Sequence, residues 1–336
     1  MTRARYARTL DDGRVQCLLC PRECRMRESQ RGFCYVRANV GGQLDLTTYG
    51  RSSGFAVDPV EKKPLNHFLP GCRVLSFGTA GCNLACKFCQ NWHISKSRSD
   101  DSLARQASPE QIADAALHRG TACVAYTYND PIIFAEYAID TAWACHERGI
   151  RNIAVSAGYI SKMARADFFA PMDAANVDLK AFSDEFYRKI TGGRLDVVLD
   201  NISWLVNETE TWVELTTLLI PGYNDSDKEL RELTGWVAQE LGVDVPLHFS
   251  AFHPSYRMSE VASTPPETLY RARQIGLDAG LHYVYTGNLH DPSGQSTFCP
   301  ECGAMVIRRD WYNTKITGLA DGCCMACGTA IAGVWR

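Results

Sequence analysis

The chain has 336 residues, of which 46% are hydrophobic and 22% are charged, and its formal net charge at pH 7 is −3. This composition suits one large globular domain with appendages, and the small net charge provides no general basic footprint for nucleic acid, although a local RNA-binding patch stays open. No apolar run approaches the ~18 residues of a membrane-spanning helix, and the first residues lack the apolar segment of a signal peptide. We therefore expect a cytoplasmic protein without a membrane partner.

Fifteen cysteines are the most informative feature of the sequence. They fall mostly in CxxC-type groups without a visible signal peptide, which favours metal ligation over disulfides. The first group holds four thiols within eighteen residues, enough for a closed zinc site or a small iron–sulfur cluster: Cys17, Cys20, Cys24 and Cys34. Structural zinc is the default interpretation, because zinc binding supplies roughly 10–16 kcal/mol to a short segment. An auxiliary electron-transfer cluster is the alternative.

Residues 41–72 are rich in Pro and Gly and predict an irregular connector. Lys62, Lys63 and His67 within it either face an active site or belong to a solvated loop. Cys72 has no partner at metal-binding spacing, so we expect a buried thiol there.

The next stretch, residues 81–92, carries Cys82, Cys86 and Cys89 at CxxxCxxC spacing, with Phe88 just before the last cysteine. Three thiolates on a four-iron cluster leave one iron open. The alternatives are three structural thiols or part of a zinc site, although zinc knuckles usually pair CxxC with a second CxxC or with histidines.

This motif resembles the signature of radical S-adenosylmethionine (SAM) enzymes. The resemblance implies that the three cysteines bind a [4Fe–4S] cluster and that the methionyl group of SAM chelates the open iron. It further implies that reductive cleavage of SAM gives a 5′-deoxyadenosyl radical, while the protein positions the cofactors. Phe88 matches the family's aromatic position near the adenine.

From residue 73 onward, predicted strands alternate with predicted helices. Apolar runs predict strands at 74–77, 123–128, 152–157, 175–179, 212–220, 247–252 and 282–285. Periodicity and capping signals predict helices at 109–119, 131–149, 162–169, 184–190, 197–207, 227–241 and 266–279. Repeated βα units imply a parallel sheet with right-handed crossovers. The radical SAM resemblance implies a partial (β/α)6 TIM-like barrel, which periodicity alone does not separate from a full barrel or a doubly wound sheet.

The ends of the predicted strands carry the candidate SAM contacts, since parallel βα folds bind ligands there. Asp178-Leu-Lys180 matches an Asp-x-Lys motif of activase-like members, and residues 221–225 resemble the family's Pro-Gly-x-x-Asp turn. Residues 128–131 depart from the activases' Gly-Gly-Glu-Pro motif, because both glycines are missing. The resemblance implies SAM contacts at Phe88, Asn129, Asp130, Ser156, Asp178, Lys180 and His253.

Residues 296–336 contain two CxxCG knuckles about twenty residues apart, with strand-like residues between them. This spacing predicts a zinc ribbon, and a rubredoxin-like iron site is the alternative because both metals accept four thiolates. Cys323 competes with its neighbour in sequence, but the glycine that follows each knuckle favours the set Cys299, Cys302, Cys324 and Cys327.

Nearly the whole chain resembles a narrower group, the radical SAM component of the AmmeMemoRadiSam system. The shared features are the terminal cysteine groups and residues 61–64, 67–71, 89–92 and 126–129. This resemblance implies AMMECR-like and Memo-like companions, and radical SAM chemistry needs an electron donor such as flavodoxin or ferredoxin.

The sequence thus predicts three regions: an N-terminal Cys-rich extension and connector (1–72), a radical SAM core (73–290) and a C-terminal zinc-ribbon-like module (291–336). The predicted function is a radical SAM oxidoreductase or transferase with an unidentified substrate. A subsidiary version is an activase that removes hydrogen from a protein glycine. The non-enzymatic alternative is a zinc-containing scaffold that carries a cluster for electron transfer.

Overall fold

The computed structural model describes residues 2–98 and 105–336. Its centre, within those residues, is an eight-stranded sheet in the order β16-β15-β14-β13-β12-β11-β9-β8. The parallel strands are β9 (Arg73–Gly78), β11 (Cys123–Tyr126), β12 (Arg151–Ser156), β13 (Ala174–Asp178), β14 (Trp212–Leu219), β15 (Leu247–Ala251) and β16 (Val284–Gly287). Consecutive strands are neighbours, an order that fits a partial barrel and confirms all seven predicted strands.

Strand β8 (Gly54–Pro59) corrects the expectation of an irregular connector over 41–72. It pairs antiparallel with β9 along its whole length and forms one edge of the main sheet. Gly54 and Pro59 sit at its two ends, and an edge strand tolerates proline because its outer side has no pairing partner. Two further short strands lie in the same segment, β6 (Gln43–Leu46) and β7 (Arg51–Ser52).

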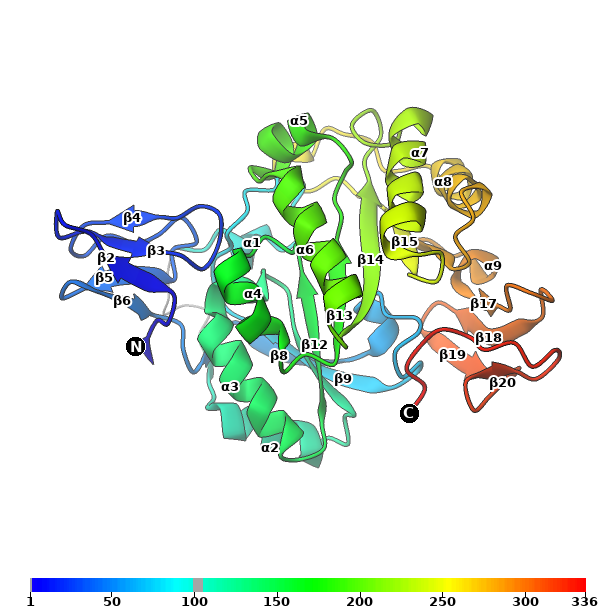
Figure 1. The fold of residues 1–336 in the computed structure, drawn as a ribbon, viewed down its shortest axis with the longest axis horizontal. Helices are drawn as coiled ribbons and strands as arrows, with labels where there is room; N and C mark the ends of the chain where they lie inside the picture. Colours follow the sequence, from blue (N-terminus) through cyan, green and yellow to red (C-terminus); the bar gives the residue numbers. More distant parts are fainter. Residues whose placement is uncertain (1, 99–104) are drawn as a thin grey trace.

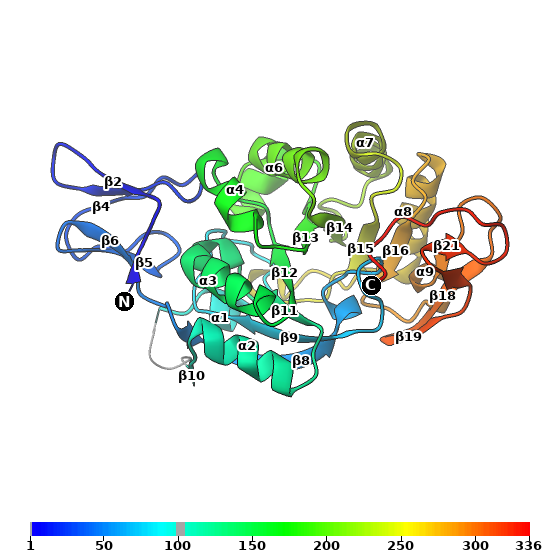
Figure 2. The same cartoon turned by 60° about the horizontal axis from the view of Figure 1, so that its bottom comes forward.

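The helices lie around the outside of this sheet (Figure 2). The main ones are α2 (Pro109–His118), α3 (Ala135–His146), α4 (Lys162–Phe169), α6 (Leu195–Glu208), α7 (Asp227–Trp236) and α8 (Pro266–Asp278). Helix α2 begins with the predicted capping box: the Ser108 hydroxyl accepts from the Gln111 N–H, and the Gln111 side chain accepts from the Ser108 N–H. No helix in the described part of the chain has the length and apolar character to cross a membrane.

A segment of residues 60–71, here called the plug, fills the barrel interior at the amino ends of the strands. Its side chains Val60, Leu65 and Phe68 are almost completely buried against the inner faces of β9, β11 and β12. The Asn176 side chain of β13 donates to the Pro64 carbonyl at 2.8 Å. Because the plug occupies this end, the space for a ligand lies toward the carboxyl ends of the strands.

Two small β modules lie at opposite ends of the long axis (Figure 1). The N-terminal module contains the sheets β1-β6-β5 and β2-β3-β4, made of β1 (Thr2–Arg3), β2 (Ala7–Thr9), β3 (Val15–Cys17), β4 (Arg25–Met26), β5 (Arg37–Val40) and β6. The C-terminal module contains β17 (Thr297–Phe298), β18 (Met305–Asp310), β19 (Asn313–Ile316), β20 (Leu319–Ala320) and β21 (Cys323–Cys324). Each predicted terminal cysteine group therefore lies in its own module.

Candidate active site

A cavity opens at the carboxyl ends of the parallel strands, where such sheets place their ligand sites. The loop after β9 contributes its three cysteines, and the loops after β11 and β13 contribute polar and charged side chains. The residues predicted as site residues that line it are Cys82, Cys86, Phe88, Cys89, Asn129, Asp130, Asp178 and Lys180. The structure thus brings most of the predicted site together from distant parts of the sequence.

The three thiols face the same cavity without being close enough to share one ion. Their sulfur atoms are not all within 4.8 Å of one another, since in residues 2–98 and 105–336 only the C-terminal thiols form a group that meets this limit. Sulfurs around a single tetrahedral ion would lie ~3.8 Å apart, given a metal–sulfur distance of ~2.3 Å. A four-iron cluster places each thiolate on a different iron and suits the wider spacing.

The cluster loop is anchored by backbone hydrogen bonds to the connection between α5 (Asp184–Phe186) and α6. The Ala85 N–H donates to the Thr191 carbonyl at 2.7 Å, and the Lys87 N–H donates to the Ile190 carbonyl at 3.0 Å. These bonds lie on both sides of Cys86, so they fix the backbone that carries its thiol.

Asn129 fastens the beginning of the same loop. Its Oδ1 accepts from the Thr79 N–H at 2.9 Å, and its Nδ2 donates to the Gly81 carbonyl at 2.9 Å. A Cβ atom at Gly78 would lie 2.6 Å from this Oδ1, so the close approach requires glycine there. The amide of Asn129 is therefore engaged with the cluster loop, although the residue also lines the cavity.

Tyr128 lies where the activases' Gly-Gly-Glu-Pro motif has a glycine, and it adopts a strained backbone conformation. Its φ is 69°, in the left-handed region that glycine favours and that other residues adopt at a cost of roughly 1–3 kcal/mol. The Asn91 side chain holds it by donating to the Tyr128 carbonyl at 2.9 Å. The turn into the cavity is thus made without either glycine.

Asp130 is buried and joins the ends of β11 and β12. Its Oδ1 accepts from the Ile132 N–H and from the Ser156 hydroxyl, and its Oδ2 accepts from the Ala157 N–H, all at 3.1 Å. Burial raises the pKa of Asp130, although these hydrogen bonds lower it in part. Ser156 is not among the described residues that line the cavity, and it contacts the site through Asp130.

Lys180 and Asp178 place a charged pair opposite the cysteines. The Lys180 Nζ lies 2.8 Å from Asp178 Oδ2 and 5.8 Å from the centroid of the Phe88 ring, and its side chain is only 12% exposed. Burial disfavours the charged lysine, but the Asp178 carboxylate and the nearby Cys86 thiol raise the pKa of Lys180. An ammonium group beside a carboxylate matches the opposite charges of a methionyl zwitterion.

His253 lies apart from these residues: it is exposed and is not among the described residues that line the cavity. The lining residues that were not predicted include Thr216, Leu218, Ser250 and Asn288. The two-residue spacing of Thr216 and Leu218 marks the face of β14 that points into the barrel. That alternation was the available signal for them, whereas Asn288 had no local signal.

Comparison with known proteins agrees with this geometry. Residues 77–234 match the profile of the Radical SAM superfamily, from β9 into α7. Over 333 residues the chain is 40% identical to an uncharacterized protein of Methanocaldococcus jannaschii. The match covers 98% of this chain and 99% of that protein. The chain belongs to the radical SAM superfamily.

Two further proteins are similar to this radical SAM protein, one in sequence and one in fold. It is 23% identical over 216 residues to the 4-hydroxyphenylacetate decarboxylase activating enzyme of Clostridioides difficile, covering 58% of this chain and 68% of that enzyme. A crystal structure of a radical SAM methyltransferase from Sphaerobacter thermophilus superposes with a TM-score of 0.51 at 18% identity, covering 65% of this chain and 67% of that chain. The second similarity concerns the fold alone.

The radical SAM protein has a separate group of four thiols in its C-terminal module. The Cys299 and Cys327 sulfurs are 3.6 Å apart and the Cys302 and Cys324 sulfurs are 3.7 Å apart, while all four lie within 4.8 Å. These distances match the ~3.8 Å expected around one tetrahedral ion. The structure places Cys324 in the group and leaves its neighbour Cys323 outside it.

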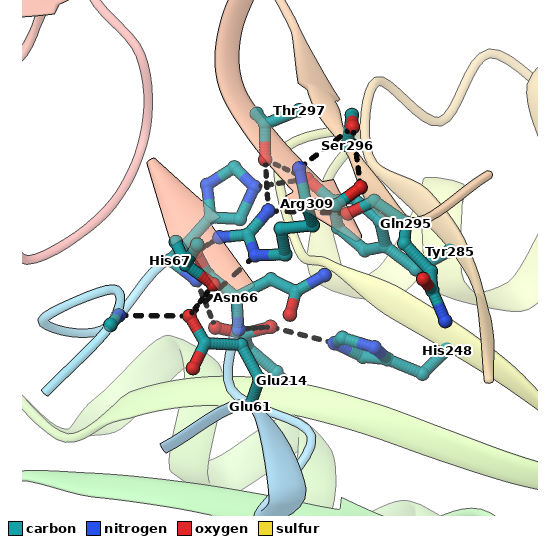
Figure 3. A network of polar contacts seen from close by, with 12 residues as sticks. Glu61, Asn66, His67, Glu214, His248, Tyr285, Gln295, Ser296, Thr297 and Arg309 are labelled. Carbon is teal, nitrogen blue, oxygen red and sulfur yellow. Dashed lines mark hydrogen bonds and ion pairs between the residues drawn. The ribbon is translucent and has the colours of Figure 1, made fainter. Parts of the chain in front are cut away.

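A buried polar network joins this module to the plug and the barrel (Figure 3). Arg309 of β18, whose side chain is 1% exposed, donates to the Asn66 carbonyl at 2.6 Å and to the Thr297 hydroxyl at 2.8 Å. Glu214 of β14 accepts from the Asn66 N–H at 2.9 Å and from His248 Nε2 at 2.7 Å. The plug is therefore held from both sides by charged groups.

His67 belongs to this network and does not line the active-site cavity. Its Nδ1 donates to the Ala332 carbonyl at 2.6 Å, and its Nε2 accepts from the Tyr285 hydroxyl at 2.5 Å. Burial lowers the pKa of His67 from 6.5 to about 4, although Glu214 raises it in part. Lys63 instead pairs with Asp58 at 3.1 Å.

Proposed function

We propose that this protein reductively cleaves SAM at a [4Fe–4S] cluster bound by Cys82, Cys86 and Cys89. When bound, the cluster and SAM supply a 5′-deoxyadenosyl radical that abstracts a hydrogen atom from an unidentified substrate. The observation that carries the proposal is the position of the three widely spaced thiols in one cavity with the partly buried Lys180–Asp178 pair.

The residues of the chain are assigned to binding and positioning. Three thiolates hold the cluster and leave one iron without a protein ligand. Lys180 and Asp178 offer opposite charges to the methionyl carboxylate and amino groups, and Phe88 lies within reach of the same ligand. Hydrogen abstraction requires a reactive atom close to one C–H bond, so these side chains need not transfer a proton.

The experiment is anaerobic reconstitution followed by addition of SAM and a chemical reductant, with 5′-deoxyadenosine as the measured product. Replacing Cys82, Cys86 or Cys89 by alanine should abolish product formation. Cys145→Ala is the matched control, because Cys145 is a buried free thiol outside the three cysteine groups. Full turnover by the triple variant would refute the assignment, and no turnover by the parent would favour the electron-transfer scaffold.

A second candidate is activation of a glycyl radical enzyme. It is supported by the similarity to the Clostridioides difficile activating enzyme and by the Asp178-Leu-Lys180 segment at the cavity. The test uses the protein fraction of cells grown on deuterated glycine as the hydrogen source. Deuterium in the 5′-deoxyadenosine supports an activase, whereas unlabelled product contradicts it.

The narrower assignment and the partners are also proposals. The resemblance of the terminal cysteine groups and of residues 61–64 and 89–92 supports the radical SAM component of the AmmeMemoRadiSam system, with AMMECR-like and Memo-like companions. A flavodoxin or ferredoxin is proposed as the electron donor, since reductive cleavage consumes one electron. For the C-terminal thiols we propose one zinc or iron ion, because both metals accept four thiolates.

A further inference from the structure

The four cysteines of the N-terminal module surround one cavity. Cys17 ends β3, Cys20 and Cys24 lie in the turn before β4, and Cys34 lies shortly before β5. Apolar side chains complete much of the lining: Leu19, Phe33 and Ile133. The thiols therefore converge in a largely apolar enclosure.

The sulfur atoms of these four cysteines lie too far apart to bind one ion. The C-terminal thiols, with sulfur separations of 3.6 and 3.7 Å, show what a single-ion site looks like in this chain. The N-terminal thiols are not such a group, because across 2–98 and 105–336 only the C-terminal set has its ligand atoms within 4.8 Å. In this respect they match the three cysteines of the active site.

A second similarity to the active-site loop is a hydrogen bond to sulfur. The Phe33 N–H donates to the Cys24 sulfur at 3.3 Å, and the Leu84 N–H donates to the Cys82 sulfur at 3.4 Å. Hydrogen bonds of this kind stabilise a thiolate and influence the reduction potential of an iron–sulfur cluster. Each loop thus presents widely spaced thiols, one of which accepts a backbone hydrogen bond.

The loops that carry the N-terminal and the active-site cysteines are in direct contact. A Cβ atom at Gly81, whose φ is 85°, would lie 2.0 Å from the Cys34 carbonyl oxygen, so the two loops are in direct contact next to Cys82. Arg22 donates to the Asn83 carbonyl at 2.5 Å, and Asn83 itself lines the N-terminal cavity. A group bound among the N-terminal thiols would be a neighbour of the active-site cluster.

We propose that Cys17, Cys20, Cys24 and Cys34 bind a second [4Fe–4S] cluster, with one thiolate on each iron, in place of the zinc ion that their sequence spacing favours. Because every iron has a protein ligand, this cluster offers no open position to SAM. The site goes beyond the proposed function and does not depend on it, since a filled cluster can be counted in protein that cleaves no SAM.

The experiment measures iron, acid-labile sulfide and zinc in the reconstituted Cys82→Ala/Cys86→Ala/Cys89→Ala variant. We expect about four sulfides per chain with matching iron, because a single C-terminal ion carries no sulfide. The electron paramagnetic resonance signal of this reduced variant should not change when SAM is added. Absence of sulfide together with about two zinc ions per chain overturns the proposal.

A second measurement uses the parent protein and so does not depend on the folding of the triple variant. Reduced parent should show two cluster signals, of which SAM shifts one, and Cys20→Ala/Cys24→Ala should lose the signal that SAM leaves unchanged. Cys145→Ala should keep both. A single cluster signal that SAM shifts completely also overturns the proposal. A parent that holds both clusters but forms no 5′-deoxyadenosine refutes the proposed function and leaves this site standing.

Discussion

The two terminal modules carry the same ligands in different geometries. Each has four cysteines, but the C-terminal sulfurs lie within 4.8 Å of one another while the N-terminal sulfurs surround a cavity. In the C-terminal module two knuckles face each other directly, whereas in the N-terminal module the thiols are spread over turns on either side of β4. Residue type and spacing in sequence therefore identify a candidate metal site, and the packing of the loops determines how far apart its thiols lie.

The largest expected effect comes from replacing one of two neighbouring cysteines in the C-terminal module, since only one of them belongs to the group of four thiols. Cys324→Ser should fail to bind the proposed ion, and should lose with it a stabilisation on the order of 10 kcal/mol for this small module. Cys323→Ser is the control, because that thiol lies outside the group. Metal analysis and limited proteolysis of both variants check this, and equal ion loss in both would contradict the ligand set.

Buried arginines offer a second comparison, since each module is attached to the barrel by one. Arg37 donates to the Ile133 carbonyl and pairs with Glu136, and both side chains of the pair are 1% exposed. Arg37→Met should cost about 3–5 kcal/mol of unfolding free energy, because it leaves a buried carboxylate unpaired. Arg309→Met should cost less, about 1.5–3 kcal/mol, because Arg309 hydrogen-bonds to neutral groups and its ion pair with the buried Glu61 is long, at 3.7 Å.

Chemical denaturation of both arginine variants at pH 7 provides the measurement. The double variant Arg37→Met/Glu136→Leu should recover much of the loss at the N-terminal module, since it removes the unpaired charge. A larger loss in Arg309→Met than in Arg37→Met would show that the C-terminal module depends more on its arginine than the contacts indicate.

Acid should weaken the attachment of the C-terminal module through His67. The unfolded chain has a His67 pKa near 6.5 and the native chain one of about 4, so below pH 6.5 the unfolded state binds a proton that the native state does not. The contribution of neutral His67 to the free energy of unfolding, at most about 3 kcal/mol, is fully present above about pH 6.5 and declines as the pH falls toward 4. The stability gap between the parent and His67→Gln should therefore narrow from pH 7 to pH 5. An unchanged gap would contradict the neutral assignment.

The smallest expected effect concerns the central cysteine group, which is proposed to hold a cluster with one open iron. Lys180→Ala should weaken SAM binding about ten- to a hundredfold, because a charge-assisted hydrogen bond in a partly buried site is worth roughly 1.5–3 kcal/mol. The cluster should still assemble, and the cluster signal during a SAM titration reports the affinity. If Lys180→Ala and Asp178→Ala bind SAM like the parent but fail to turn over, the pair acts on the substrate instead.

Local patterns in the sequence were sufficient for much of this structure. The seven parallel strands follow from apolar runs, the start of α2 from its capping box, and the choice of Cys324 over Cys323 from the glycine after the knuckle. These features depend on residues near one another in sequence, where backbone propensity and chelate spacing act directly.

Features that depend on distant contacts could not be predicted in this way. Strand β8 is defined by its pairing with β9, and its glycine and proline suggested a loop. His67 belongs to the buried polar network of Figure 3 through its hydrogen bond to Ala332, 265 positions away. From the sequence alone, His67 was a candidate either for the active site or for a solvated loop. The separation of the N-terminal sulfurs likewise depends on how turns pack, which CxxC spacing does not encode.

The attachment of the plug has a consequence for the order of events during synthesis of the chain. Phe68 forms a parallel bridge with Val334, and the Leu69 N–H donates to the Val334 carbonyl at 2.7 Å. Residues near 334 leave the ribosome long after the strands that surround the plug. In a nascent chain the loop that carries Cys82, Cys86 and Cys89 can therefore form while the plug is not yet covered by the C-terminal residues. The plug is covered only once the residues near 334 have emerged.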